Sequence, residues 1–172
     1  MLKMQQQDSR VADGVNLLIS ILVRFPEIGT INYDANKNTL KLTFMVASDL
    51  QEQDFAKTRK LMVDSIAAYH MLEGLKAEVN DVSLSDCDEM KMLTILRDVA
   101  SLTKGEITLI IQLLRDNCQE YLIADQNEAM LEEDLLVQEE VIDDMLENVK
   151  QQKHSNGLIG IREDGRVLVF NK

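Results

Sequence analysis

The order of strand and helix patterns between residues 39 and 124 constrains the fold more than any other feature of the chain. Apolar and polar residues alternate from Thr39 to Val46, as in a strand with one buried face. A helical pattern follows and stops at Gly74, and a second one begins near Thr103. The two strands expected between these helices cover Leu75 to Leu84 and Met90 to Arg97. The pattern predicts an α+β fold with a ferredoxin-like β-α-β-β-α-β core, an antiparallel sheet with two helices, closed by a short strand from Tyr121 to Ala124.

The third strand of this predicted core, Met90 to Arg97, is apolar on both faces. Met92 and Leu96 share one face, whereas Leu93 and Ile95 share the other. A strand of this kind is typical of the centre of a sheet that is covered on both sides. We therefore expect the segments at the two ends of the chain to cover the face that two core helices would leave open.

Two capping-box patterns predict where the core helices begin. Ser48 stands three residues before Gln51, and Thr103 stands three residues before Glu106. In a capping box, the first side chain bonds to the backbone of the second residue, and the second side chain reaches back.

The segment before the core, residues 8–38, predicts a helix and a strand. The helix ends at Arg24 and is apolar around most of its circumference, so it needs cover on more than one side. It either lies between the sheet and another element or forms a subunit contact. Ile28 to Tyr33 reads as a strand that is joined to the core by a turn-forming loop, which predicts a hairpin extending the sheet.

The segment after the core, residues 125–172, predicts a long helix from Glu128 to Lys150 and a terminal hairpin. The hairpin strands, Leu158 to Arg162 and Arg166 to Phe170, flank an Asp-Gly turn. An isolated hairpin is barely stable in water, so this one must dock on the domain or on a second subunit. Together the three segments predict a single domain over residues 1–172.

The long helix carries most of the negative charge. The chain has a net charge of -12, and residues 125–149 contain ten acidic residues and no lysine or arginine. The candidate acidic docking face consists of Glu132, Glu133, Glu139, Glu140, Asp143, Asp144 and Glu147. This face could dock a basic partner or bind divalent cations. Alternatively, it is the solvated side of an amphipathic helix, partly balanced by nearby lysines and arginines.

Charge and composition disfavour several classes of partner. A strongly acidic chain repels nucleic-acid phosphates and anionic membrane surfaces, so we expect neither a nucleic-acid nor a membrane partner. The apolar run from Val15 to Val23 is too short to span a bilayer and lacks the features of a signal peptide. Cys87 and Cys118 match no disulfide framework, and we expect a cytoplasmic protein.

The sequence contains no recognisable catalytic, cofactor or metal motif. The turn from Asp86 to Glu89 gathers carboxylates around Cys87 but lacks the pattern of an EF-hand loop. His70, His154, Cys87 and Cys118 do not have the spacing of metal ligands or of a catalytic pair. Thr103-Lys104-Gly105 opens a helix and could bind an anion, but Glu106 already supplies negative charge there, so we interpret Thr103 and Glu106 as a helix cap. We therefore predict no catalytic residues, no cofactor and no metal.

These observations favour a non-catalytic protein that acts through protein–protein contact or self-association. The apolar first helix and the terminal hairpin both need a surface to dock on, and a second copy could supply one. The alternative is a regulatory domain that binds a small molecule, which requires an enclosed pocket. The third hypothesis, an enzyme, requires scattered polar residues to converge in one cleft.

Overall fold

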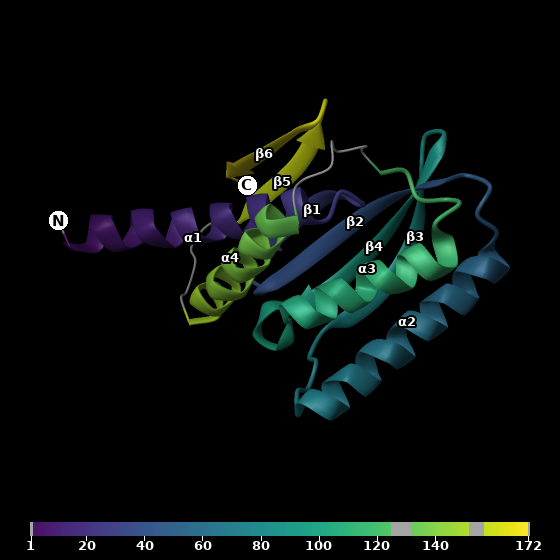
Figure 1. The fold of residues 1–172 in the computed structure, drawn as a ribbon, viewed down its shortest axis with the longest axis horizontal. Helices are drawn as coiled ribbons and strands as arrows, with labels where there is room; N and C mark the ends of the chain where they lie inside the picture. Colours follow the sequence, from purple (N-terminus) through teal and green to yellow (C-terminus); the bar gives the residue numbers. More distant parts are fainter. Residues whose placement is uncertain (1, 125–131, 152–156, 172) are drawn as a thin grey trace.

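The computed structural model describes the backbone of residues 2–124, 132–151 and 157–171, with side chains from residue 13 onward except 132–135. It has an α+β architecture with a six-stranded antiparallel sheet in the order β3-β4-β2-β1-β5-β6 (Figure 1). The strands are β1 (Ile28–Asp34), β2 (Thr39–Ala47), β3 (Asn80–Cys87), β4 (Met90–Asp98), β5 (Leu158–Glu163) and β6 (Arg166–Asn171). The helices are α1 (Leu2–Arg24), α2 (Glu52–Glu73), α3 (Lys104–Cys118) and α4 (Glu132–Gln151), with a 3-10 turn η1 (Val99–Ser101).

The described helices gather on one face of the sheet. One row across that face consists of Gly160, Ile31, Leu42, Ile95 and Val82. A Cβ at Gly160 would lie 3.4 Å from a methyl carbon of Leu18, so α1 covers this face. Arg97, two residues after Ile95 and therefore on the same face, bonds to side chains of α2 and α3. The fourth helix, α4, contacts α1, α3 and η1 (Figure 1).

Helix α1 lies between the sheet and α4. It contacts β1, β5 and β6 on one side and α4 on the other. The residues that α1 buries from these two sides include Leu17, Leu18, Ile21 and Leu22. This confirms the expectation that the first helix is covered on more than one side, and it identifies the cover as parts of the same chain.

Both predicted hairpins are present. The strands β1 and β2 pair through the turn after Asp34, and β5 and β6 pair through Asp164 and Gly165, which both have positive φ. The terminal hairpin docks by pairing β5 with β1. The hairpin and the described side chains of α1 from Leu17 to Leu22 therefore dock within the same chain.

The structure does not confirm the ferredoxin-like topology. The order β3-β4-β2 agrees with three core strands, but β1 occupies the place beside β2 that the closing strand would take. The segment from Tyr121 to Ala124 makes only a single bridge, between Leu122 and Val46. The physical reason is that β1 and β2 are adjacent in the sequence and pair along six residue positions, which leaves only the end of β2 for the later segment.

The prediction that both faces of β4 are covered is wrong. Leu93 and Ile95 are fully buried under the helices, whereas Met92 and Leu96 lie on the other face, which no described helix covers. Met90 on that face is 37% exposed. The terminal segments join the helix layer or lengthen the sheet instead of forming a third layer. No helix in the described part of the chain combines the length and hydrophobicity needed to cross a bilayer.

The guanidinium of Arg162 in β5 donates to backbone carbonyls at the end of α1. Its acceptors are the carbonyl oxygens of Leu22, Phe25 and Ile28. These carbonyls lie at or just beyond the negative end of the helix dipole, where a partly buried cation is stabilising. The contact therefore ties α1 to the terminal hairpin.

We expect Arg162→Met to lower the free energy of unfolding by about 2 kcal/mol, because charged hydrogen bonds to these carbonyls are lost. Urea denaturation followed by circular dichroism measures the change. Arg166→Met makes the same substitution at an exposed position of the same hairpin and should cost much less. Equal losses in the two variants would contradict the proposed role of Arg162.

Candidate functional site

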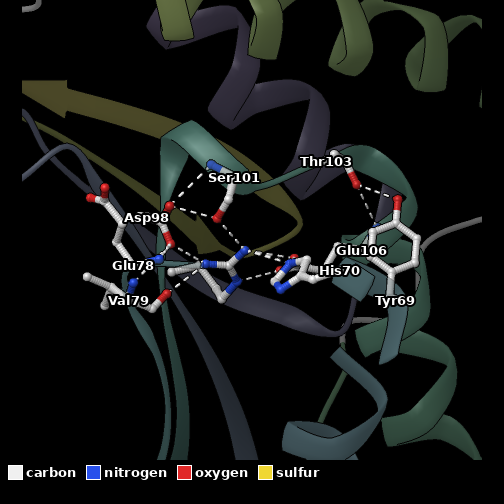
Figure 2. A network of polar contacts seen from close by, with 9 residues as sticks. Tyr69, His70, Glu78, Val79, Asp98, Ser101, Thr103 and Glu106 are labelled. Atoms are coloured by element: carbon white, nitrogen blue, oxygen red, sulfur yellow. Dashed lines mark hydrogen bonds and ion pairs between the residues drawn. The ribbon is translucent and has the colours of Figure 1, made fainter. Parts of the chain in front are cut away.

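The most distinctive chemical cluster is a buried ion network around Arg97, at the end of β4. It joins β4 to η1, to the start of α3 and to the last turn of α2 (Figure 2). Arg97 is 1% exposed and Glu106 is 0% exposed. Arg97 and Asp98 are the last two residues of β4, and of the network residues the sequence pattern marked only Glu106, as part of a cap.

Arg97 and Glu106 form a two-point ion pair. The Nε atom of Arg97 donates to Oε2 of Glu106 at 2.6 Å, and Nη2 donates to Oε1 at 2.8 Å. The same Oε1 also contacts Nε2 of His70. Nη2 of Arg97 also lies 3.0 Å from the same Nε2, so this imidazole nitrogen sits between the guanidinium and the carboxylate. The network therefore links His70 of α2 to Glu106 of α3.

Asp98 binds the side of the Arg97 guanidinium that Glu106 does not contact. Its Oδ1 accepts from Nη1 of Arg97 at 2.5 Å and from the backbone N–H groups of Glu78 and Val79, and its Oδ2 accepts from Ser101. Burial acts to raise the pKa of Asp98, but hydrogen bonds from Ser101 and Val79 and the charge of Arg97 lower it to about 2. The ionised carboxylate therefore holds the segment before β3 against η1.

This network has the geometry of a structural clamp. Its charged atoms are almost completely enclosed and satisfy one another, whereas a catalytic group must reach a substrate in a cleft. Although burial acts to lower the pKa of Arg97, Glu106 and Asp98 raise it, so the guanidinium keeps its charge. We interpret the cluster as the connection that fixes α2 and α3 on the sheet.

The start of α3 confirms part of the predicted cap. The hydroxyl of Thr103 accepts from the backbone N–H of Glu106 at 3.2 Å and bonds to the hydroxyl of Tyr69 at 2.6 Å. However, the Glu106 side chain binds Arg97 and does not reach back to the helix start. A Cβ at Gly105 would lie 2.5 Å from the Tyr69 hydroxyl, so α2 packs closely on this turn. At the helix start that was considered for anion binding, the backbone N–H of Glu106 therefore bonds within the chain.

The other predicted cap is wrong. Helix α2 begins at Glu52, and its N-cap residue, Gln51, makes no capping hydrogen bond with its side chain. Gly74 does end this helix in the left-handed conformation, as predicted.

The predicted acidic docking face of α4 is partly engaged within the chain. Glu139 accepts two hydrogen bonds from Arg24 and lies 3.8 Å from Lys104, which also approaches Asp143. Glu147 pairs with Lys150 on the same helix. Glu140 and Asp144 are exposed, and the side chains of Glu132 and Glu133 lie outside the described residues. Glu139 therefore helps to hold α4 against α1 and α3.

The candidate metal and thiol residues do not converge. Across the described residues, no group of three or more histidine, cysteine and acidic side chains is arranged to hold a metal ion. Cys87 lies at the β3–β4 hairpin, whereas Cys118 is buried beside Thr58. Burial raises the pKa of the Cys118 thiol, which disfavours the reactive thiolate. His154 lies outside the described residues.

Two grooves near α2 are open to solvent. One is lined by Asp54, Lys57, Thr58, Leu61, Asn117, Glu120 and Tyr121, and the other by Gln51, Glu52, Gln53 and Asp54. Their linings are mostly polar and acidic, whereas small-molecule sites are usually enclosed and mostly apolar. These grooves give no support to the small-molecule hypothesis.

No described helix covers the face of the sheet opposite the helix layer, and we call this face the open sheet face. Its apolar side chains are Met45, Met90, Met92, Leu96, Ile159, Ile161, Leu168 and Phe170. The methionines cluster on β2 and β4, and the hairpin residues cluster on β5 and β6. A row of Thr94, Thr43 and Thr30 crosses the sheet between them and continues to Ile161. Phe170 is 51% exposed, so the hairpin cluster includes a large uncovered aromatic ring.

The chain matches no protein-family model, no curated protein and no solved structure.

Replacing Arg97 by methionine should destabilise the protein strongly, because Glu106 and Asp98 would remain buried without their cation. We expect a loss of about 3–5 kcal/mol in the free energy of unfolding, measured by urea denaturation. Arg59→Met is the matched control, because the Arg59 side chain is 49% exposed and its ion pair with Asp81 spans 4.0 Å. A loss at Arg97 no larger than at Arg59 would refute the clamp.

The low pKa of Asp98 predicts a specific dependence on pH. Because the folded-state pKa is about 2 and the ordinary value is 3.8, the ionised carboxylate stabilises the fold above pH 3.8. This contribution, about 2 kcal/mol, is lost as the pH falls from 3.8 toward 2. The difference in unfolding free energy between the wild type and Asp98→Asn should therefore be constant near neutral pH and shrink in acid. Asp64→Asn, the same change on the exposed side of α2, controls for net charge.

Proposed function

We propose that this protein is non-catalytic and acts by self-association, with a second copy of the chain packed against the open sheet face. The observation that carries the proposal is the position of Met92 and Leu96, which lie on β4, an interior strand of the six-stranded sheet, but on the face that no described helix covers. This face has exposed apolar side chains on β4 and β6 and partly exposed ones on β2 and β5, and a cluster of this kind is typical of an interaction surface. The proposed setting is the cytoplasm, and the proposed partner is neither nucleic acid nor membrane.

The size of this face is suitable for a dimer. Strands about 4.8 Å apart, with residues about 3.3 Å apart along each strand, give a sheet face of roughly 600 Å² in projection. The accessible surface of its side chains is larger than this projection. A stable interface buries about 800 Å² on each partner. The area of the open sheet face is therefore of the order that a stable dimer requires.

The distribution of charge favours the open sheet face over the acidic helix layer as the site where a second copy binds. The charged residues on the open sheet face have both signs: Lys41, Arg166, Asp34, Asp81 and Glu163. The acidic residues Glu140 and Asp144 lie on α4, within the helix layer on the other side of the sheet. Two copies joined through their open sheet faces therefore keep their acidic helices apart, which limits repulsion between chains with a net charge of -12.

A glutamate at Met92 should prevent this association, because the interface would have to bury a carboxylate. We expect Met92→Glu to lower the molar mass measured by size-exclusion chromatography with light scattering, with dimerisation at least about tenfold weaker. Met71→Glu, the same substitution at a position on α2 that is 83% exposed, should leave the mass unchanged. Circular dichroism checks that both variants fold. A wild-type monomer at micromolar concentration, or equal masses for the two variants, would overturn the proposal.

A further inference from the structure

The two edges of the sheet differ in how they are protected. At one edge, β3 carries the exposed acids Asp81 and Asp86, and Arg59 donates to its Val82 carbonyl at 2.8 Å. Charged residues and side chains that cover backbone groups are the usual protection against pairing between edges. At the other edge, β6 reads Arg-Val-Leu-Val-Phe-Asn, without an acid or a proline. The edge at β6 is therefore the one suited to pair with another strand.

The hairpin geometry determines which backbone groups of β6 point outward. Glu163 and Arg166 flank a two-residue turn, so they form a hydrogen-bonded pair. From there, non-hydrogen-bonded and hydrogen-bonded pairs alternate along the two strands. Leu168 and Phe170 consequently bond toward β5. The backbone N–H and C=O groups of Val167, Val169 and Asn171 point away from β5, toward the open edge.

We infer that β6 pairs with β6 of a second copy, antiparallel, with Val169 opposite Val169. This register engages the outward groups of Val167, Val169 and Asn171 in both copies. It also places Leu168 of each copy opposite Phe170 of the other on the open sheet face, which is a favourable aliphatic–aromatic cross-strand pair. The only charge on β6 is that of Arg166, so the contact brings together little of the chain's acidic charge.

This edge contact goes beyond the proposed function and uses a different twofold axis. The axis that relates two antiparallel edge strands is perpendicular to the sheet, whereas the axis between two packed sheet faces lies parallel to it. Two perpendicular twofold axes that intersect generate a closed tetramer. The assembly would consist of two continuous sheets, each made from two copies, packed through their open faces.

Proline at Val169 tests the edge contact directly, because it removes the N–H that the partner strand would accept. Proline is tolerated on an edge strand where the N–H faces solvent, so the β5–β6 pair should persist. We expect Val169→Pro to convert the tetramer into a dimer by light scattering. Val169→Thr retains the N–H and the β-branched shape and should remain tetrameric.

Combining this substitution with Met92→Glu separates the two contacts. If both contacts exist, each single variant is a dimer and the double variant is a monomer. If only the edge contact is wrong, Val169→Pro has the mass of the wild type while Met92→Glu still lowers it. If only the face contact is wrong, Met92→Glu has the mass of the wild type and Val169→Pro gives a monomer.

Disulfide trapping keeps the inference falsifiable even if Val169→Pro does not fold. Leu168→Cys combined with Phe170→Cys, in a Cys87→Ser background, places two cysteine pairs across the edge contact. Such non-hydrogen-bonded pairs have Cα atoms about 4.5 Å apart, within the range for a disulfide. We expect a covalent dimer under oxidising conditions, and none with Leu168→Cys alone. Failure of the double-cysteine variant to cross-link would overturn the register.

Discussion

The one-sided cover of the sheet is the constraint on which the rest of the structure depends. Every described helix packs on the face that carries Leu42 and Ile95, so the hydrophobic core forms between one sheet and one helix layer. The layer is two helices deep at one end, where α4 packs on α1 and α1 packs on the hairpin strands. This arrangement buries Leu17, Leu18, Ile21 and Leu22 of the first helix inside the subunit and leaves the opposite face of the sheet without a helix among the described residues.

The ion network at Arg97 fixes the position of the helix layer on the sheet. A helix layer held only by apolar contacts could slide on the sheet, because such contacts have little directionality. The two-point contact between Arg97 and Glu106 is directional, and His70 and Asp98 extend it to α2 and to the segment before β3. Buried charges are expensive unless paired, so the network favours one register of α2 and α3 over its neighbours.

Much of the local structure could be predicted from the sequence. The alternation in β2, the Asp-Gly turn before β6 and the glycine that ends α2 are local signals with direct physical causes. Strand order was predicted less well, because pairing of β1 with β2 competes with pairing of the segment after Cys118, and no local pattern ranks the two. The cover of β4 was also misjudged, since methionine and leucine on an outer face have the same alternation as those in a core.

The candidate sites were harder to predict than the fold. Glu106 fits a capping box with Thr103, and only the structure shows that its carboxylate turns to Arg97. The acidic residues of α4 form a continuous stripe in the sequence, but Glu139 contacts Arg24, which is 115 positions away. Such long-range partners cannot be inferred from spacing. The sequence argument for self-association was based on α1 and the terminal hairpin, whereas the proposal made from the structure is based on the open sheet face.

The clustering of methionines on the open sheet face has a chemical consequence. Met45 lies directly opposite Met92 on the neighbouring strand, and Met90 follows on the same side, so three thioethers share one uncovered surface. Peroxide converts a thioether into a sulfoxide, which is polar and can be reduced back enzymatically. Oxidation of these three methionines would therefore add oxygen atoms to the open sheet face and make that surface more hydrophilic without breaking the backbone.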